Sequence, residues 1–351
     1  MNPVRNLSVL RKLVQLLAFG ALVYGSTLTG YFLADKLSIA FPVLTCAFDL
    51  NNADIGVLIP LQHEMAHRMG ETFAAGGNLW MRGVLPVLTT LGTFLLLFVL
   101  LNKAFCGWIC PMGFFQEVVH MIGQKLGIRP RESLSAGTVD KLRPGKWLIL
   151  IGLVLLLPLM AGLGTVSHSY VDPYCQICPS RMVTTLANGS VEEVFLDTSG
   201  PTRLALSGVA NFLFGLILAV GLTVRQPFCR ICPMLGLHAA FRKLGLLRLV
   251  KKPVPRCDKC GICAQACPMD IREVHTSQKD GDVTFPDCTL CGRCVELCPD
   301  RDVLQLRYAG LKVFGADPGY FKQRNQAQRR WQAGNLADWL RRKGPAGGEA
   351  K

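Results

Sequence analysis

The sequence predicts an all-α polytopic membrane domain with four transmembrane helices and an internal duplication, followed by a small α+β domain. Two observations carry this prediction. The first is a set of four long apolar runs without charge, and the second is a set of 15 cysteines that recur in short, regularly spaced motifs. We place the domains at residues 1–252 and 253–308, with a basic C-terminal tail at 309–351.

The four apolar runs are each about as long as the roughly 20 residues that an α-helix needs to cross a bilayer. A helix in the core of a soluble protein rarely runs so far without a charged residue. We therefore expect the chain to be embedded in a lipid bilayer, with membrane helices at 13–34, 83–102, 147–166 and 204–224.

The net charge of +14 is concentrated beside these runs. Residues 225–256 alone hold eight basic residues and no acidic one, whereas the segments 36–82 and 167–203 hold three and two basic residues. Cytoplasmic loops of membrane proteins collect Lys and Arg, so we expect both chain ends on the cytoplasmic side. This bias accounts for the charge without a nucleic-acid partner, for which no reading motif is present.

Two cysteine motifs near the C-terminus, "CDKCGICAQACP" from 257 and "CTLCGRCVELCP" from 288, share the spacing C-x2-C-x2-C-x3-C-P. Three cysteines so spaced wrap one corner of an iron–sulfur cubane, and the fourth ligates the other cluster. The spacing predicts a two-cluster bacterial ferredoxin domain with two [4Fe–4S] clusters. Zinc is the alternative for a lone C-x2-C pair, but two complete quartets favour iron and sulfur. The first ferredoxin quartet is Cys257, Cys260, Cys263 and Cys298, and the second ferredoxin quartet is Cys288, Cys291, Cys294 and Cys267.

A second kind of cysteine motif follows the second and the fourth apolar runs. "FCGWICPMG" begins at 105 and "FCRICPMLG" begins at 228. Their equivalent positions indicate an internal duplication that brings four thiolates together, the number that a third cubane needs. The alternative is buried free cysteine, which is common in helices. This membrane quartet consists of Cys106, Cys110, Cys229 and Cys232.

With these motifs the chain resembles the NapH/MauN family of ferredoxin-type membrane proteins, which are related to the polyferredoxin parts of the NosR and CcoG groups. The resemblance implies a multi-pass electron-transfer subunit of the bacterial cytoplasmic (inner) membrane. It also implies exchange of electrons with the quinone pool or a cytoplasmic donor, and with periplasmic redox enzymes. The chain departs from the family pattern at its second motif, which is C-x2-C-P where the family is described by C-x3-C-P.

A third cysteine pair, Cys175 and Cys178, lies in "VDPYCQICPSR", and Cys46 lies in "VLTCAFD". Counting spans places these three thiols on the outer side. Three interpretations compete: a fourth iron–sulfur cluster, a redox-active dithiol of Cys175 and Cys178, or structural cysteines. For a cluster, the candidate fourth ligands are Asp49, Asp172, His168, His63 and His67.

The stretch "HEMAH" places His63 and His67 one helical turn apart with a glutamate between them. This matches the zinc-protease pattern H-E-x-x-H, but so short a pattern arises often by chance and no further ligand motif follows it. The remaining interpretations are a solvated helix face or a role near the outer cysteines. That role is either cluster ligation or the acceptance of quinol protons, because imidazole titrates near neutral pH.

We therefore expect one-electron relay, with a redox-enzyme component of the quinol dehydrogenase type as the first hypothesis. It oxidises quinol and passes electrons to another iron–sulfur, cytochrome or reductase subunit. The alternatives are a transmembrane reductant for a periplasmic disulfide, metal or maturation target, and a non-catalytic assembly factor. No cysteine or histidine lies in the four expected spans. Direct transfer across a hydrocarbon layer of about 30 Å therefore looks implausible without a quinone.

Overall fold

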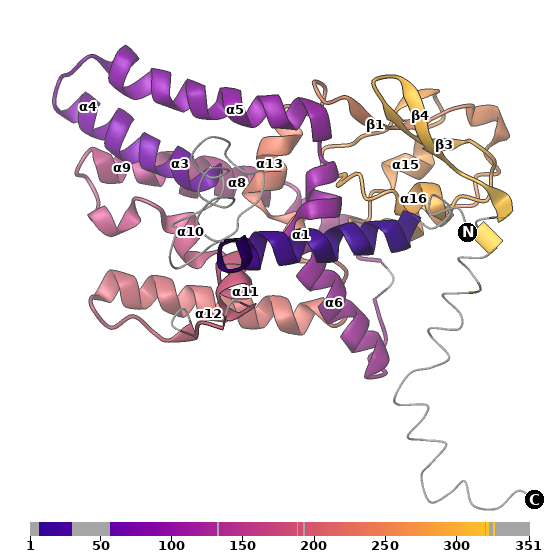
Figure 1. Cartoon of the computed structure of the whole chain (residues 1–351), viewed down its shortest axis with the longest axis horizontal. Coiled ribbons are helices and arrows are strands. Elements are labelled where there is room, and N and C mark those ends of the chain that lie inside the picture. Colours follow the sequence, from indigo (N-terminus) through magenta and orange to yellow (C-terminus); the bar gives the residue numbers. More distant parts are fainter. Residues whose placement is uncertain are drawn as a thin grey trace, which may run out of the picture.

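The computed structural model describes residues 7–29, 57–131, 133–187, 189–191, 194–319, 321–322 and 326. The long helices form a bundle at one end of the molecule and a small sheet domain lies at the other (Figure 1). The N-terminal helix α1 (Leu7–Thr29) starts beside the sheet domain and runs along the bundle. The tail beyond residue 326 and Cys46 lie outside the described residues.

Four helical segments are long and apolar enough to cross a membrane, which confirms the four predicted spans. The first candidate span, Leu7–Tyr24, starts earlier than expected and contains Arg11. The Arg11 side chain is buried, and its guanidinium pairs with the Glu117 carboxylate at 2.7 Å. This pairing explains how a charge is accommodated within the helix. The other spans are η4–α5 (Trp80–Val84, Leu85–Leu101), α7–α9 (Ala136–Leu142, Gly145–Ile149, η6 Leu150–Leu156, Leu157–Gly162) and α12 (Pro201–Gly221).

A further helical run lies in the segment that the sequence suggested was an outer loop. It consists of α3 (Leu58–His63), η3 (Glu64–Gly70) and α4 (Glu71–Ala74), and it packs against α5 and α9. The close approach depends on glycine, because a Cβ atom added to Gly70 would lie 2.7 Å from the Cα of Gly162. The run leads to α4 at the end of the bundle far from the sheet (Figure 1), and His63 and His67 lie in it, in α3 and η3.

Three shorter helices begin at a Cys-Pro dipeptide: α6 (Pro111–Lys125), α11 (Pro179–Ala187) and α13 (Pro233–Ala240). Proline is well suited to the first helical position, where its missing N–H is not needed. The cysteine before it therefore stands at the helix N-terminus, where backbone N–H groups and the helix dipole favour a thiolate. The short α10 (Pro173–Ile177) ends at the second of these cysteines, Cys178.

The C-terminal domain is built on an antiparallel sheet with the strand order β2-β1-β3-β4. The strands are β1 (Leu247–Lys251), β2 (Gly281–Asp282), β3 (Leu304–Tyr308) and β4 (Leu311–Gly315). Short helices α14 (Ile262–Ala266), α15 (Glu273–Thr276) and α16 (Arg293–Glu296) complete it. The sheet extends beyond both predicted limits, 253 and 308, because β1 pairs with β3 and β3 pairs with β4.

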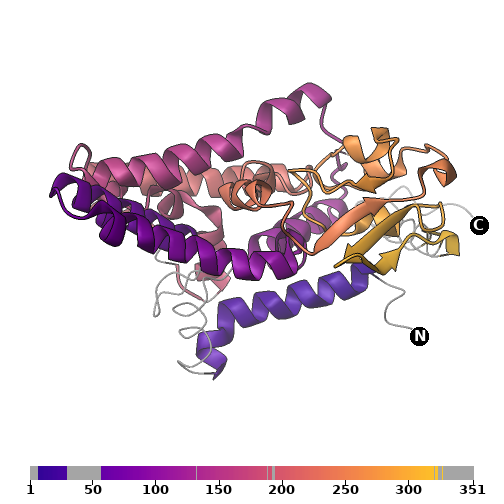
Figure 2. The ribbon, with the colours of Figure 1, turned by 90° about the horizontal axis from the view of Figure 1, so that it is seen from above.

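Buried ion pairs fasten this domain to the bundle. Lys146 on α8 pairs with Asp287, and Arg230 pairs with Asp270 at 2.8 Å. Lys103 donates to the backbone carbonyl of Phe285 at 2.9 Å. Figure 2 shows the sheet domain directly at the end of the long helices. Arg230, one of the basic residues of segment 225–256 that we assigned to membrane topology, therefore also helps to hold the two domains together.

Candidate metal centres

The four cysteines of the second ferredoxin quartet line one small cavity although they come from two separate motifs. The chain turns there through Gly292, whose φ of 76° is in the left-handed region that glycine adopts readily. The backbone N–H of Leu290 donates to Sγ of Cys288 at 3.4 Å. Burial raises the pKa of Cys288 to about 11 and that of Cys267 to about 12. A bound metal would offset this cost, because coordination deprotonates a thiol.

The first ferredoxin quartet is also assembled from both motifs. Cys263 lies close enough to Cys257 and Cys260 for their charges to interact, and Cys298 is similarly close to Cys263 and Cys260. Gly261, with φ of 77°, plays the part that Gly292 plays in the other motif. Cys260 is exposed to solvent, whereas Cys288 and Cys291 are buried. The first ferredoxin quartet is therefore the one nearer to the surface.

The membrane quartet comes together at the boundary between the two hydrophobic cores of the protein. The Cys106 thiol interacts electrostatically with Cys110, Cys229 and Cys232, and burial raises its pKa well above the usual value. Cys106 and Cys229 pack against the core of the C-terminal domain, and Cys110 packs against the core of the bundle. The two halves of this group lie more than a hundred residues apart in the chain, as the repeated motif predicts.

The donor sets fit iron–sulfur cubanes better than single ions. Within the described ranges, no three Cys, His, Asp or Glu side chains are close enough together to hold one metal ion. A cubane is ligated at its corners, so its four thiolates stand further apart than the ligands of one ion. Four cysteines around a cavity, as in the second ferredoxin quartet, match that requirement.

The membrane quartet and the second ferredoxin quartet are in direct contact through their loops. The Trp108 indole N–H donates to the carbonyl oxygen of Leu290 at 3.0 Å. A Cβ atom added to Gly107 would lie 3.0 Å from the Cα of Cys291, and closer still to the carbonyl oxygen of Thr289. Gly107 and Trp108 therefore allow the "CGWICP" loop to pack directly against the "CTLCG" loop. This packing brings two of the candidate centres side by side.

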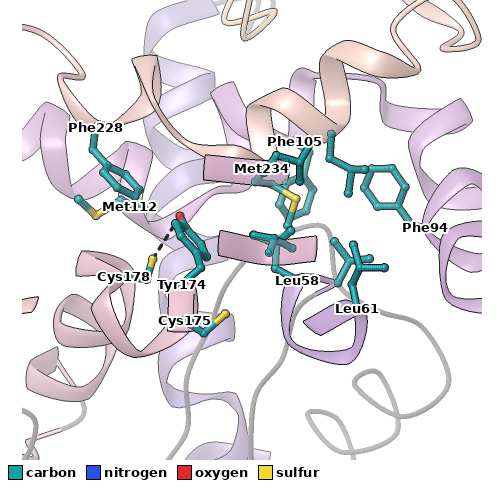
Figure 3. Packing of buried hydrophobic residues seen from close by; sticks show 14 of the residues in the cluster. Leu58, Leu61, Phe94, Phe105, Met112, Tyr174, Cys175, Cys178, Phe228 and Met234 are labelled. Atoms are coloured by element: carbon teal, nitrogen blue, oxygen red, sulfur yellow. Dashed lines mark hydrogen bonds between the residues drawn. The ribbon is translucent and has the colours of Figure 1, made fainter. Parts of the chain in front are cut away.

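We expected Cys175 and Cys178, here called the core pair, on the outer side. The structure instead places them inside the bundle. Both thiols are buried in the core of the bundle, among Met112, Tyr174 and Phe228 (Figure 3). The Cys178 Sγ lies 3.6 Å from the Tyr174 hydroxyl, with which it hydrogen bonds. Cys178 is also close enough to Cys110 and Cys232 for their charges to interact. The chain returns inward after the third span through α10, which counting spans could not show.

Three histidines, His63, His67 and His168, line a cavity of about 710 Å³, here called the histidine cavity. The ring centres of His63 and His67 are 5.8 Å apart, and those of His67 and His168 are 5.3 Å apart. His67 Nδ1 lies 2.6 Å from a carboxylate oxygen of Glu71. Sequence reasoning named His168 only as a cluster ligand and did not place it beside this pair. Its segment, η7 (His168–Tyr170), follows α9, which packs against η3.

The glutamate of "HEMAH" faces away from this histidine group. Glu64 accepts a hydrogen bond of 2.6 Å from the Thr90 hydroxyl on α5. A zinc protease needs that carboxylate beside the metal-bound water. The structure thus gives no support to the protease interpretation.

Comparison with known proteins agrees with the cysteine geometry. Residues 84–129 and 206–253 match the family described as "4Fe-4S binding domain". Residues 256–301 match the family described as "4Fe-4S dicluster domain". No solved structure matches the chain.

The relatives among characterised and uncharacterised proteins are distant. An uncharacterised protein of Methanocaldococcus jannaschii, MJ0750, is 26% identical over 53% of this chain and 67% of its own length. The methylamine utilization ferredoxin-type protein MauN of Methylobacillus flagellatus is 25% identical over 48% of each chain. The ferredoxin-type protein NapH of Haemophilus influenzae is 27% identical over 48% of this chain and 49% of its own. The chain thus spans about half the length of NapH and MauN.

The cysteine groups, the four apolar helices and these matches define an iron–sulfur electron-transfer protein with a membrane domain. Within that class, the chain is similar to the ferredoxin-type proteins NapH and MauN.

Proposed function

We propose that the protein is a quinol-oxidising subunit of the bacterial inner membrane that relays electrons through [4Fe–4S] clusters to a partner redox enzyme. Its first and second ferredoxin quartets and its membrane quartet would each hold one cluster. The observation that carries this proposal is the proximity of the membrane quartet to two other cysteine groups. Its loop contacts that of the second ferredoxin quartet at Gly107, and Cys110 and Cys232 lie close enough to Cys178 of the core pair for their charges to interact.

The order of the centres supports a relay with one exposed end. Cys260 of the first ferredoxin quartet is exposed, so a partner protein has access there. The second ferredoxin quartet packs in the core of the C-terminal domain, the membrane quartet lies between the two cores, and the core pair lies in the core of the bundle. When bound, each cubane supplies one-electron transfer at a potential that burial and hydrogen bonds to sulfur adjust. The chain's own residues hold the loops so that neighbouring centres stay adjacent.

The duplicated arrangement of the membrane domain supports a shared ligand set. The family match falls in two segments, one around each Cys-Pro motif of the membrane quartet. Each segment pairs a long apolar helix, α5 or α12, with a helix that starts at Cys-Pro, α6 or α13. A two-cluster ferredoxin fold for the sheet domain is part of the same proposal. So is an orientation with both chain ends in the cytoplasm, which the basic residues favour.

The histidine cavity is where we place the quinol headgroup. It is lined by imidazoles that can accept protons and by Gln176, which follows Cys175 directly in the chain. Gln62, the neighbour of His63, donates to Cys175 Sγ at 3.0 Å. In the reaction the two O–H bonds of the hydroquinone break and a quinone forms. Bases of the cavity would accept the two protons, and bound iron–sulfur clusters would accept the two electrons one at a time.

The same contacts favour a second candidate function, the transfer of cytoplasmic electrons to an outer acceptor. From the sequence, direct transfer across the hydrocarbon layer looked implausible without a quinone. Because Cys178 lies close to Cys110 and Cys232, the inner and core cysteines form a continuous series. The direction of flow then depends on which end is supplied with reductant.

Anaerobic mixing of the purified protein with menadiol tests the proposal and separates the two candidates. Quinol oxidation predicts reduction of the clusters by menadiol within the mixing time of a stopped-flow instrument. A Leu206→Trp variant should slow this reduction, because Leu206 lines the histidine cavity. Its matched control on the same helix is Leu204→Trp, at a position with 42% exposure that does not line the cavity. Reduction by a low-potential ferredoxin but not by menadiol would favour the second candidate.

A further inference from the structure

Two buried glutamines make the same set of hydrogen bonds at two different cysteine pairs. Gln116 on α6 donates to Sγ of Cys229 at 3.3 Å and accepts from the backbone N–H of Phe228 at 2.9 Å. Gln62 on α3 donates to Sγ of Cys175 at 3.0 Å and accepts from the backbone N–H of Tyr174 at 3.2 Å. In each case, the glutamine and the cysteine are 113 residues apart in the chain.

The orientation of each amide group is fixed by its other partners. The oxygen must face the backbone N–H, because that group can only donate. The nitrogen also donates to a carbonyl oxygen one turn earlier, that of Met112 for Gln116 at 3.1 Å and that of Leu58 for Gln62 at 3.0 Å. A carbonyl oxygen can only accept. In both places it is therefore an N–H that points at the sulfur.

The sequence around the two cysteine pairs repeats as well. "YCQICP" from Tyr174 and "FCRICP" from Phe228 share an aromatic residue, both cysteines, isoleucine and proline at the same spacing. Cys178 and Cys232 both stand just before a helix that starts at proline, and both have an extended backbone with ψ near 123° and 124°. The core pair is thus a second copy of one half of the membrane quartet.

We infer that the core pair is a half-site for a fourth iron–sulfur cluster, and that Gln62 and Gln116 are positioning residues that tune the potentials of two separate clusters. A neutral thiol or a disulfide sulfur is a weak acceptor. A buried amide N–H aimed at one would be left nearly unsatisfied, which is unfavourable. Gln62 and Gln116 are 0% and 1% exposed, so water does not replace the bond. A metal-bound thiolate is an acceptor that justifies both contacts.

The remaining ligands of this fourth site differ from those of the membrane quartet. Asn52 and Gly56 stand at the positions equivalent to Cys106 and Cys110, and Cys46 is the single cysteine in the sequence before Gln62. Within the described part of the chain, the site therefore has two thiols, those of Cys175 and Cys178. This inference rests on the iron–sulfur function proposed above.

An EPR-monitored redox titration of the full-length protein tests it. A hydrogen bond donated to a ligating sulfur stabilises the reduced cluster, so its loss lowers the midpoint potential. Gln116→Leu should lower the potential of one signal and Gln62→Leu that of a different signal. The matched control is Gln15→Leu, which removes an equally buried amide that bonds the carbonyl oxygen of Gly107 and no sulfur. It should shift neither signal.

Iron analysis of Cys175→Ser supplies a second measurement that does not depend on the glutamine variants. It should show about four iron atoms per chain fewer than the wild type. The inference is overturned if Gln62→Leu leaves every potential unchanged while Gln116→Leu shifts one, or if Cys175→Ser keeps the full iron content. A wild-type protein without iron would instead refute the proposed function itself.

Discussion

The indole N–H of Trp108 donates a hydrogen bond of 3.0 Å to the carbonyl oxygen of Leu290. This bond joins the first cysteine motif of the membrane domain to the loop of the second ferredoxin quartet. The rate of electron transfer between two centres falls steeply with the distance between them. The contact matters because it fixes that distance. A ferredoxin domain tethered only by a linker would lose that control.

The close packing around Gly107 gives the first prediction. Gly107→Ala places a methyl group against the carbonyl oxygen of Thr289 and the backbone of Cys291. Overpacking of this kind costs about 1–3 kcal/mol. We expect a lower midpoint of thermal unfolding and slower electron exchange between the two centres. The control is Gly92→Ala on α5, where nothing lies within 4 Å of the added atom. Equal behaviour of the two variants would contradict the docked arrangement.

The shared membrane quartet gives the second prediction. Cys106→Ser and Cys229→Ser should abolish the same EPR signal, because each removes a ligand from one common cubane. Cys260→Ser should leave that signal intact and alter a ferredoxin signal instead. If Cys106→Ser and Cys229→Ser each removed a different signal, the two motifs would belong to separate sites.

The buried pair of Lys146 and Asp287 gives the third prediction. Lys146→Met leaves Asp287 with Arg143 as its remaining ion-pair partner, at 3.3 Å. Removal of one member of a buried pair typically costs about 3–5 kcal/mol. Thermal unfolding in detergent should show a loss of that order. Lys312→Gln breaks the exposed pair with Asp302 and should cost about 0–1 kcal/mol. A Lys146→Met variant as stable as Lys312→Gln would show that the pair does not hold the domains together.

His120 on α6 gives the fourth prediction, on pH. Burial lowers its pKa to about 4. Its neutral form suits the site, where Nδ1 lies 3.3 Å from the carbonyl oxygen of Gly221 and Nε2 lies 3.2 Å from the Gln124 amide nitrogen. Because the folded-state pKa is below the unfolded value of about 6.5, the contribution is present above pH 6.5 and is lost as the pH falls towards 4. His120→Gln should therefore reduce the drop in unfolding midpoint between pH 7 and pH 5. An unchanged drop would contradict a contribution of His120 to the pH dependence of stability.

The sequence predicted the features that depend on local spacing. Cys257 and Cys260 can be assigned to one turn because two intervening residues allow little else, and the apolar runs define spans because a bilayer sets their length. The convergence of Cys106 with Cys229 was predictable only because the motif is repeated. The burial of Cys178 inside the bundle was not predictable, because counting spans assumes that a loop stays outside the bundle.

Two further features were visible in the sequence but carried no weight alone. The repeat of "YCQICP" and "FCRICP" is short, and it gains meaning from the matching hydrogen bonds of Gln62 and Gln116. The meeting of His168 with His67 depends on the packing of α9 against η3 through Gly70 and Gly162. Such helix packing is a property of the assembled bundle, and no local pattern specifies it.

The most direct test of the account is the iron content of the full-length protein purified without oxygen. Three quartets predict about 12 iron atoms and a similar amount of acid-labile sulfide per chain, and a fourth cluster at the core pair raises each to about 16. Protein that contains zinc with little iron and no labile sulfide would contradict the relay of iron–sulfur centres on which the account depends.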